Sequence, residues 1–149
     1  MNDLLKRFWE WINMTPKEYS KSEKLYLDGI FEDDYPQMDE LLSFAKHIVS
    51  ENDLDKNNIE DLITVLALDN ESEELLDFIK ANSSYEQLNV IVNIGLSSIQ
   101  PNARWQIAML ITERKPPKYR EMLLVLSKDE NEYVAKRAKH CICFLDGNL

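Results

Sequence analysis

Two consecutive helix-pair units of matching register occupy Ser84–Leu145, which reads SYEQLNVIVNIGLSSIQPNARWQIAMLITERKPPKYREMLLVLSKDENEYVAKRAKHCICFL. Each unit has an apolar helix, a polar turn and a second helix that begins with polar residues. A shift of 31 positions superimposes Val92 on Leu123 and Ala103 on Val134, a period typical of helical solenoids. Because a unit this small cannot bury its apolar face alone, it must pack on a neighbour.

The polar turn inside each unit recurs at a nearly constant interval. Asp69 lies 29 positions before Ser98, and Ser98 lies 31 positions before Asp129. This spacing predicts three helix-pair units, at residues 55–82, 84–114 and 117–146. The β-branched run Val90–Val92 is the main place where a strand competes, but no second strand candidate of similar length exists. We therefore expect a helix there.

Three less regular helices are expected before residue 55. The first, over residues 2–13, has apolar residues at helical spacing, including Phe8 and Trp9. We interpret it as a cap on the open end of the stack in preference to a membrane anchor, because its basic face is thin. Thr15–Pro16 marks the start of a second helix, expected to reach Ile30. Pro36 is expected to open the third.

Length and composition favour one helical domain. The chain has 149 residues with only three Gly and five Pro, so helix breakers are few and the length suits a single core. We expect a single all-α domain, residues 1–149, of about eight or nine helices. Residues 1–54 form its irregular part, and residues 55–149 form the three repeats.

The charge is negative and unevenly distributed. The formal net charge is −10. Residues 1–80 contain 8 Lys and Arg against 20 Asp and Glu, whereas residues 81–149 contain 9 against 7. Such a chain repels nucleic acid and anionic membranes and attracts basic partners. It has no secretory leader pattern and no apolar run near the roughly 20 residues that cross a bilayer, so we expect a cytoplasmic protein.

The residues needed for most catalytic sites are scarce. His47 and His140 are the only histidines, and neither belongs to a zinc or di-iron motif. No glycine-rich phosphate loop or nucleophile elbow occurs. Cys141 and Cys143 lie two positions apart on a helix and point in different directions, which suits reduced, packed thiols. We therefore expect no enzyme activity, no cofactor and no metal.

Acidic clusters at helix ends are the first candidate binding residues. Acidic first turns often serve only to complement the helix dipole, but the summed field of several clusters also steers a basic partner. The candidates for this role are Glu32, Asp33, Asp34, Asp69, Glu71, Glu73 and Glu74. Trp105 and Tyr133 flank the turns, where they either pack between units or anchor a protein partner.

Basic side chains on the second helix of each unit are the candidates for binding nucleic acid instead of a basic protein. They would line the concave surface of a solenoid, where a nucleic-acid groove needs positive charge. Apolar residues interrupt these positions, however, and binding phosphate requires a continuous basic track. We therefore expect no nucleic-acid binding through the residues concerned, which are Arg104, Lys136, Arg137 and Lys139.

The stretch Asp129–Ala138, DENEYVAKRA, resembles the turn and second helix of HEAT repeats. That family has arginine where Ala135 stands, and Arg104 occupies the equivalent place one unit earlier. The resemblance covers residues 85–145 and extends more loosely over 55–82. It implies a right-handed stack of antiparallel helix hairpins, a HEAT-like α-solenoid.

The chain is also similar in size, acidity and repeat style to immunity proteins of bacterial polymorphic-toxin and contact-dependent growth-inhibition systems. This resemblance implies a monomer that binds one cognate basic toxin domain, often a nuclease and here most plausibly a ribonuclease, in a 1:1 complex. It also implies that the immunity protein blocks the active site or substrate groove of the toxin. The alternatives are a HEAT-like nucleic-acid-binding protein or glycosylase, and an adaptor subunit of a cytosolic complex.

Overall fold

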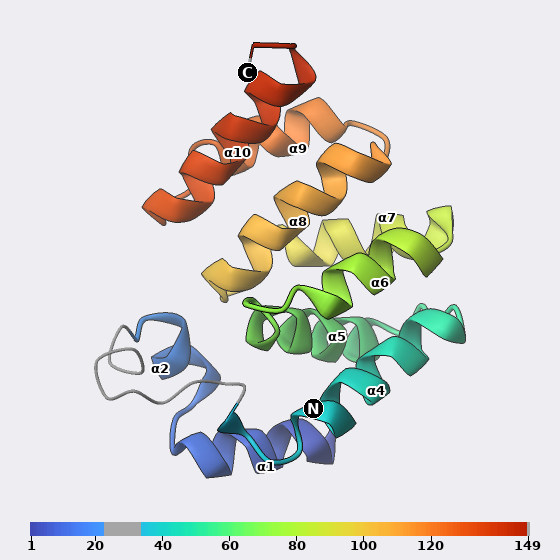
Figure 1. The fold of residues 1–149 in the computed structure, drawn as a ribbon, viewed down its shortest axis with the longest axis vertical. Helices are drawn as coiled ribbons and strands as arrows, with labels where there is room; N and C mark the ends of the chain where they lie inside the picture. The colour runs from blue at the N-terminus through green and yellow to red at the C-terminus, as the bar shows by residue number, and fades with distance from the viewer. Residues whose placement is uncertain (23–33, 149) are drawn as a thin grey trace.

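The computed structural model describes residues 1–22 and 34–148, and over these ranges the protein is all-α, with nine helices and no strand (Figure 1). The helices are α1 (Asp3–Ile12), α2 (Pro16–Ser20), α4 (Met38–Ser50), α5 (Lys56–Leu68), α6 (Glu74–Asn82), α7 (Tyr85–Gly95), α8 (Pro101–Arg114), α9 (Tyr119–Leu126) and α10 (Glu132–Leu145). The predicted fold class and the expected number of helices are confirmed.

Each of the three predicted units contains one pair of helices: α5 with α6, α7 with α8, and α9 with α10. The run Val90–Val92 lies within α7, so the helical interpretation of this β-branched segment is correct. α1 lies at one end of the long axis, and α9 and α10 lie at the other (Figure 1). A right-handed, HEAT-like winding of the pairs stays a prediction.

The central helix is α8, which packs against α5, α6, α7, α9 and α10. Its buried residues surround the whole helix axis instead of forming one stripe, as expected for a helix enclosed by others. α7 approaches it closely at Gly95, where an added Cβ would lie 2.5 Å from Cδ1 of Ile107. A side chain at this crossing would force the Ile107 side chain to shift, so glycine permits the close approach of the two helices.

An aromatic cluster holds the N-terminal helices against the core. Phe8 and Trp9 on α1 are buried, and their rings meet Tyr19 of α2 at 6.3 and 5.5 Å between centroids. The Phe8 ring also meets Tyr35 edge-on at 5.2 Å. These contacts support a cap that packs inward. No helix within the described ranges is long and apolar enough to cross a membrane.

One of the two predicted N-terminal helix starts differs in the structure. The capping box at Thr15 is present, since its side chain accepts from Glu18 N and the Glu18 carboxylate accepts from Thr15 N. That helix ends at Ser20 and is shorter than predicted; the predicted positions Leu25, Tyr26 and Ile30 lie outside the described residues. The third helix begins at Met38, two residues later than the predicted start at Pro36.

A side chain from the preceding turn caps the start of α6. The Asp69 carboxylate accepts the hydrogen bond from Leu75 N at 2.7 Å. The helix begins only at Glu74, because Glu73 adopts a left-handed conformation with φ of 55°. The Ser72 hydroxyl supports this cap by donating to the other oxygen of Asp69.

Side chains from α7 and α8 donate to buried carbonyl oxygens at the ends of earlier helices. Gln87 Nε2 donates to the carbonyls of Ile48 and Asp53 at 3.0 and 2.9 Å. Gln106 Nε2 donates to Leu66 O at 2.7 Å. Ile48 and Leu66 lie in the last turns of α4 and α5, where the helix itself supplies no donor, and Asp53 follows the end of α4. The second unit therefore supplies donors to the ends of α4 and α5.

Arg114, at the end of α8, completes α6 in the same way. Its guanidinium donates to Lys80 O at 2.9 Å, to Ser83 O at 2.9 Å and to the Ser83 hydroxyl at 3.0 Å. It also lies 5.4 Å from the ring centre of Tyr85. One side chain thus joins the C-terminus of α6 to both helices of the next unit.

The last unit exposes part of its apolar face. Val92 and Leu123 are equivalent positions and both are buried, as the 31-residue register predicts. Val125, the equivalent of half-buried Ile94, is 65% exposed, and Leu124 beside it is exposed too. The 31-residue register therefore identifies equivalent positions correctly but does not predict how deeply each is buried, because burial depends on the neighbouring helix.

We predict that Arg114→Met destabilises the fold by about 1.5–3 kcal/mol, because hydrogen bonds from a charged donor to half-buried carbonyls are lost. Urea unfolding followed by circular dichroism measures the change. Arg120→Met is the matched control: Arg120 forms an exposed, solvent-screened ion pair with Asp146, so its loss should cost clearly less stability than the loss of Arg114. Equal losses of stability in the two variants would show that the hydrogen bonds from Arg114 to the C-terminus of α6 do not stabilise the fold.

Candidate functional site

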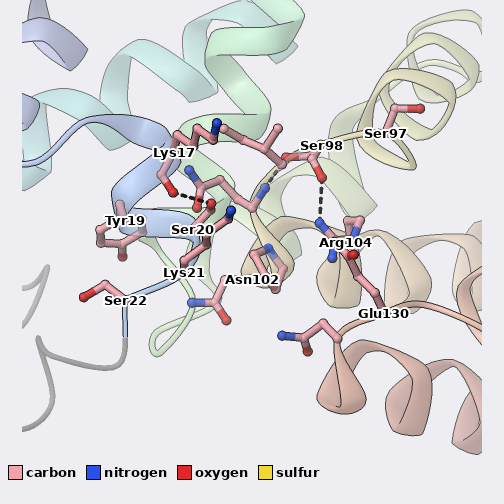
Figure 2. A pocket seen from close by; sticks show the side chains of 14 residues that line it. Lys17, Tyr19, Ser20, Lys21, Ser22, Ser97, Ser98, Asn102, Arg104 and Glu130 are labelled. Atoms are coloured by element: carbon pink, nitrogen blue, oxygen red, sulfur yellow. Dashed lines mark hydrogen bonds between the residues drawn. The ribbon is translucent and has the colours of Figure 1, made fainter.

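A hollow of the described structure lies between α2 and the turns that precede α8 and α10 (Figure 2). Its volume is about 850 Å³, and we call it the turn groove. Its lining residues are Lys17, Tyr19, Ser20, Lys21, Ser22, Ser97, Ser98, Ile99, Gln100, Pro101, Asn102, Arg104, Glu130 and Asn131. Figure 2 shows that α2 contributes one side and the two turns contribute the other.

Arg104 builds the inner side of the turn groove. Its Nε and Nη2 donate to the two carboxylate oxygens of Asp129 at 2.8 and 2.9 Å, and its Nη1 donates to Ser98 O at 2.7 Å. Both side chains of the ion pair are about nine-tenths buried. The planar guanidinium thus ties the turn before α8 to the turn before α10, which a lysine could not do with the same geometry.

The Asp129 carboxyl is held in its charged form. Burial raises its pKa, but hydrogen bonds from Arg104 and from Asn131 N–H, together with the Arg104 charge, outweigh burial and leave the pKa below its ordinary value. The Asn131 side chain then accepts from Val134 N at 3.1 Å and caps α10. The charge pair and the helix cap therefore form one connected network.

The outer wall of the turn groove carries free positive charge. Lys17 lies in α2 and Lys21 is the C-cap residue of the same helix, so the two are about one helical turn apart. Both are exposed. Neither forms an ion pair with a carboxylate in the described ranges. Gln100 Nε2 donates to Pro16 O at 2.8 Å and so fixes this wall against the start of α8.

The two predicted aromatic anchors meet beside the turn groove. The rings of Trp105 and Tyr133 pack edge-to-face with centroids 5.8 Å apart, and Arg137 lies over both, at 4.8 and 5.8 Å. Trp105 is only 6% exposed and donates to Asn102 at 3.2 Å, so it packs between units and offers little surface to a partner. Tyr133 is 49% exposed and is available as an anchor.

The predicted acidic residues fall into different environments. Glu32 and Asp33 lie outside the described residues, and Asp34 is exposed. Glu71 and Glu74 are exposed and Glu73 is half-buried. The remaining candidate, Asp69, is 1% exposed and caps α6, so its predicted place on a steering surface is wrong. None of the described acidic candidates lines the turn groove.

Carboxylates outnumber cations strongly in the middle of the chain. Residues 38–86, the acidic segment, contain 13 Asp and Glu against three Lys. Each of these lysines is already in an ion pair: Lys46 with Glu74, Lys56 with Glu60, and Lys80 with Asp77. Most of the carboxylates in the segment are exposed. The segment therefore presents a surplus of negative charge to solvent.

The other reactive side chains are dispersed. His47 and His140 are exposed on α4 and α10, and neither lines the turn groove. Within the described ranges, no group of three His, Cys, Asp or Glu residues is placed to hold a metal ion. Cys141 is buried and Cys143 is exposed, so only Cys141 is packed as expected.

Protein families, curated proteins and solved structures were each compared with this chain, and none matches it. Function is therefore inferred from the residues themselves. Sequence reasoning missed Lys17, Lys21 and Gln100 as groove residues. The spacing of the two lysines after the Thr15 cap signalled a shared helical face, but nothing in the sequence showed that α2 lies against the turns of later units.

We predict that Asp129→Asn destabilises the protein by up to about 3–5 kcal/mol at neutral pH, because the variant leaves the Arg104 guanidinium buried without its counter-charge. In the wild type the folded-state pKa of Asp129 lies below its unfolded value near 3.9. Its stabilising contribution is therefore complete above about pH 4 and is lost as pH falls through the folded-state pKa.

Chemical unfolding between pH 2 and 7 measures this effect. The loss of stability on acidification should be smaller in Asp129→Asn than in the wild type. Asp39→Asn removes an exposed carboxylate and controls for the change in net charge. Parallel pH profiles for the wild type and Asp129→Asn would show that the ion pair does not contribute.

Proposed function

We propose that the chain is a cytoplasmic immunity protein that binds and neutralises a cognate basic toxin domain. In this proposal the toxin is a nuclease, with ribonuclease activity the leading case, and the two proteins form a 1:1 complex. The chain acts by blocking the active site or substrate groove of the toxin and has no catalytic activity of its own.

The observation that carries this proposal is the surplus of exposed carboxylates in the acidic segment. Its three lysines are already paired with carboxylates, so the remaining exposed Asp and Glu residues act on their surroundings. A field of one sign steers an oppositely charged partner and raises its association rate by about 10- to 1,000-fold. The formal charge of −10 acts in the same direction over the whole chain.

A nuclease fits this surface better than most basic partners. An enzyme that holds a nucleic-acid backbone needs positive charge in its substrate groove. An inhibitor with exposed carboxylates can occupy that groove in place of the phosphates, and its charge also keeps it from binding the nucleic acid itself. Complementary charge thus supports both fast association and selection of the partner.

The buried side-chain clamps support tight binding. Gln87, Gln106 and Arg114 fix the ends of earlier helices against the second unit. Arg104 fixes the two later turns to each other. A surface built on such a framework changes little when a partner binds, which limits the entropy lost on association.

The first test measures association with the protein encoded next to this chain. We predict that Asp39→Lys combined with Glu71→Lys lowers the association rate constant by about tenfold at low salt, because two exposed negative charges become positive. The difference should shrink at high salt, where the Debye length is only about 3 Å. Stopped-flow fluorescence at two salt concentrations measures both effects.

The matched control for charge reversal is Glu121→Lys, which changes an exposed carboxylate on α9, far along the chain from the acidic segment. It should leave the association rate within about twofold of the wild type. If no neighbouring protein binds, or if binding is indifferent to salt and to the reversed charges, the proposal is wrong. A gel shift of nucleic acid at physiological salt would instead favour the nucleic-acid-binding alternative.

Tyr133 provides a separate prediction about dissociation. Because the ring is half exposed and Arg137 and Trp105 hold it in place, we expect Tyr133→Ala to raise the dissociation rate constant by 10-fold or more, with little change in association. Surface plasmon resonance separates the two rates. Tyr85→Ala, at an exposed tyrosine on α7, is the control and should change neither.

A further inference from the structure

The turn groove presents several hydrogen-bond donors without carboxylate partners. The ammonium groups of Lys17 and Lys21 form no ion pair with any described residue. The first turn of α8 adds a further donor. The side chain of its N-cap residue, Gln100, accepts no hydrogen bond from this turn. The backbone N–H of Asn102 therefore has no acceptor within the described structure. The positive end of this helix dipole therefore opens into the groove.

The turn groove also presents an acceptor inside its wall. Gln100 is 3% exposed, and its Nε2 is committed to Pro16 O. Its Oε1 receives no hydrogen bond from any residue of the described ranges. This oxygen is not fully enclosed and Gln100 lines the groove, so a ligand in the groove can donate a hydrogen bond to it in place of solvent.

These groups together define the chemistry of the occupant. A ligand that satisfies them brings negative charge for Lys17 and Lys21, and an N–H or O–H group for Gln100. The exposed side chain of Ile99 on the same wall adds an apolar contact. A polypeptide segment with an acidic side chain offers all three, since its backbone supplies N–H groups and its side chains supply carboxylate and apolar surface.

We propose that the turn groove binds an extended acidic segment of a partner polypeptide. In this arrangement Lys17 and Lys21 contact a carboxylate, and Asn102 N–H donates to the same segment. Gln100 Oε1 accepts from its backbone. Arg104 acts as a positioning residue, because its three hydrogen bonds to Asp129 and Ser98 hold the inner side of the groove in place.

The occupant is a polypeptide and not a nucleic acid. The formal charge of −10 repels a polyanion over the whole molecule, whereas a short peptide with one or two carboxylates experiences mainly the local field of the groove. Glu130 lines the opposite side, which interrupts the continuous basic track that phosphates require. The groove is separate from the acidic segment, so this site and the proposed toxin binding can fail independently.

The test is an NMR titration of the full chain with a capped hexapeptide, acetyl-Gly-Ile-Asp-Glu-Ser-Gly-amide. The expected shifts are largest at the backbone amides of Asn102, Ser98 and Lys21. Lys17→Ala combined with Lys21→Ala should weaken peptide binding fivefold or more. Both lysines are exposed, so these substitutions preserve the fold. Lys128→Ala combined with Lys139→Ala removes two exposed lysines elsewhere and should leave binding unchanged.

A second variant tests the same site in the opposite way. Asn102→Asp keeps an oxygen that accepts from Trp105 Nε1, suits the first turn of a helix, and places a negative charge in the groove. It should weaken peptide binding at least as much as the double lysine variant. Shifts outside the groove, or binding that is indifferent to both variants, would overturn the proposal.

Inorganic phosphate and an eight-nucleotide oligothymidylate are titrated in parallel. Both should bind at least tenfold more weakly than the peptide. Tighter binding by phosphate would assign the groove to small anions, and tighter binding by the oligonucleotide would assign it to nucleic acid. Either outcome would overturn the polypeptide assignment while leaving the proposed toxin binding by the acidic segment untouched.

Discussion

Carbonyl oxygens at the C-termini of α4, α5 and α6 face the interior, where their own helices provide no donors. The structure satisfies them from the second helix pair, with Gln87 serving α4, Gln106 serving α5 and Arg114 serving α6. Leaving such a carbonyl unpaired in the core costs about 1–3 kcal/mol. The position of each helix end relative to α7 and α8 therefore has little freedom, and the remaining features of the molecule are built around this fixed centre.

The turn groove follows from the same constraint. Arg104 uses its donors on Ser98 O and on Asp129, so the two turns keep a constant separation. Gln100 attaches the α2 wall through Pro16 O. A hollow between three segments distant in sequence persists because side-chain hydrogen bonds hold its rim. Few apolar residues are available at these turns to do so by packing.

The charges divide between two regions whose electrostatic effects differ in range. The acidic segment carries exposed carboxylates whose effect is long-ranged and depends on salt. Among the described residues, the turn groove carries two lysines that pair with no carboxylate, a helix N-terminus and a single lining carboxylate, so its effect is local. A partner that is basic overall and has one acidic loop would be attracted by the first region and held in orientation by the second. This division is consistent with a protein that acts by binding.

The sequence by itself determined the helices, because the spacing of apolar residues and the turn residues at Asp69, Ser98 and Asp129 are local signals. It also determined the surplus of negative charge. It did not determine which candidate side chains are consumed inside the fold. Asp69 reads as an exposed acid, yet it caps α6. Trp105 and Tyr133 each fit either packing or anchoring from the sequence, yet only Trp105 is buried. Only the tertiary structure decided these cases and brought α2 against the turn before α8. Burial and pairing depend on residues up to 84 positions apart, and a local pattern carries no information about such contacts.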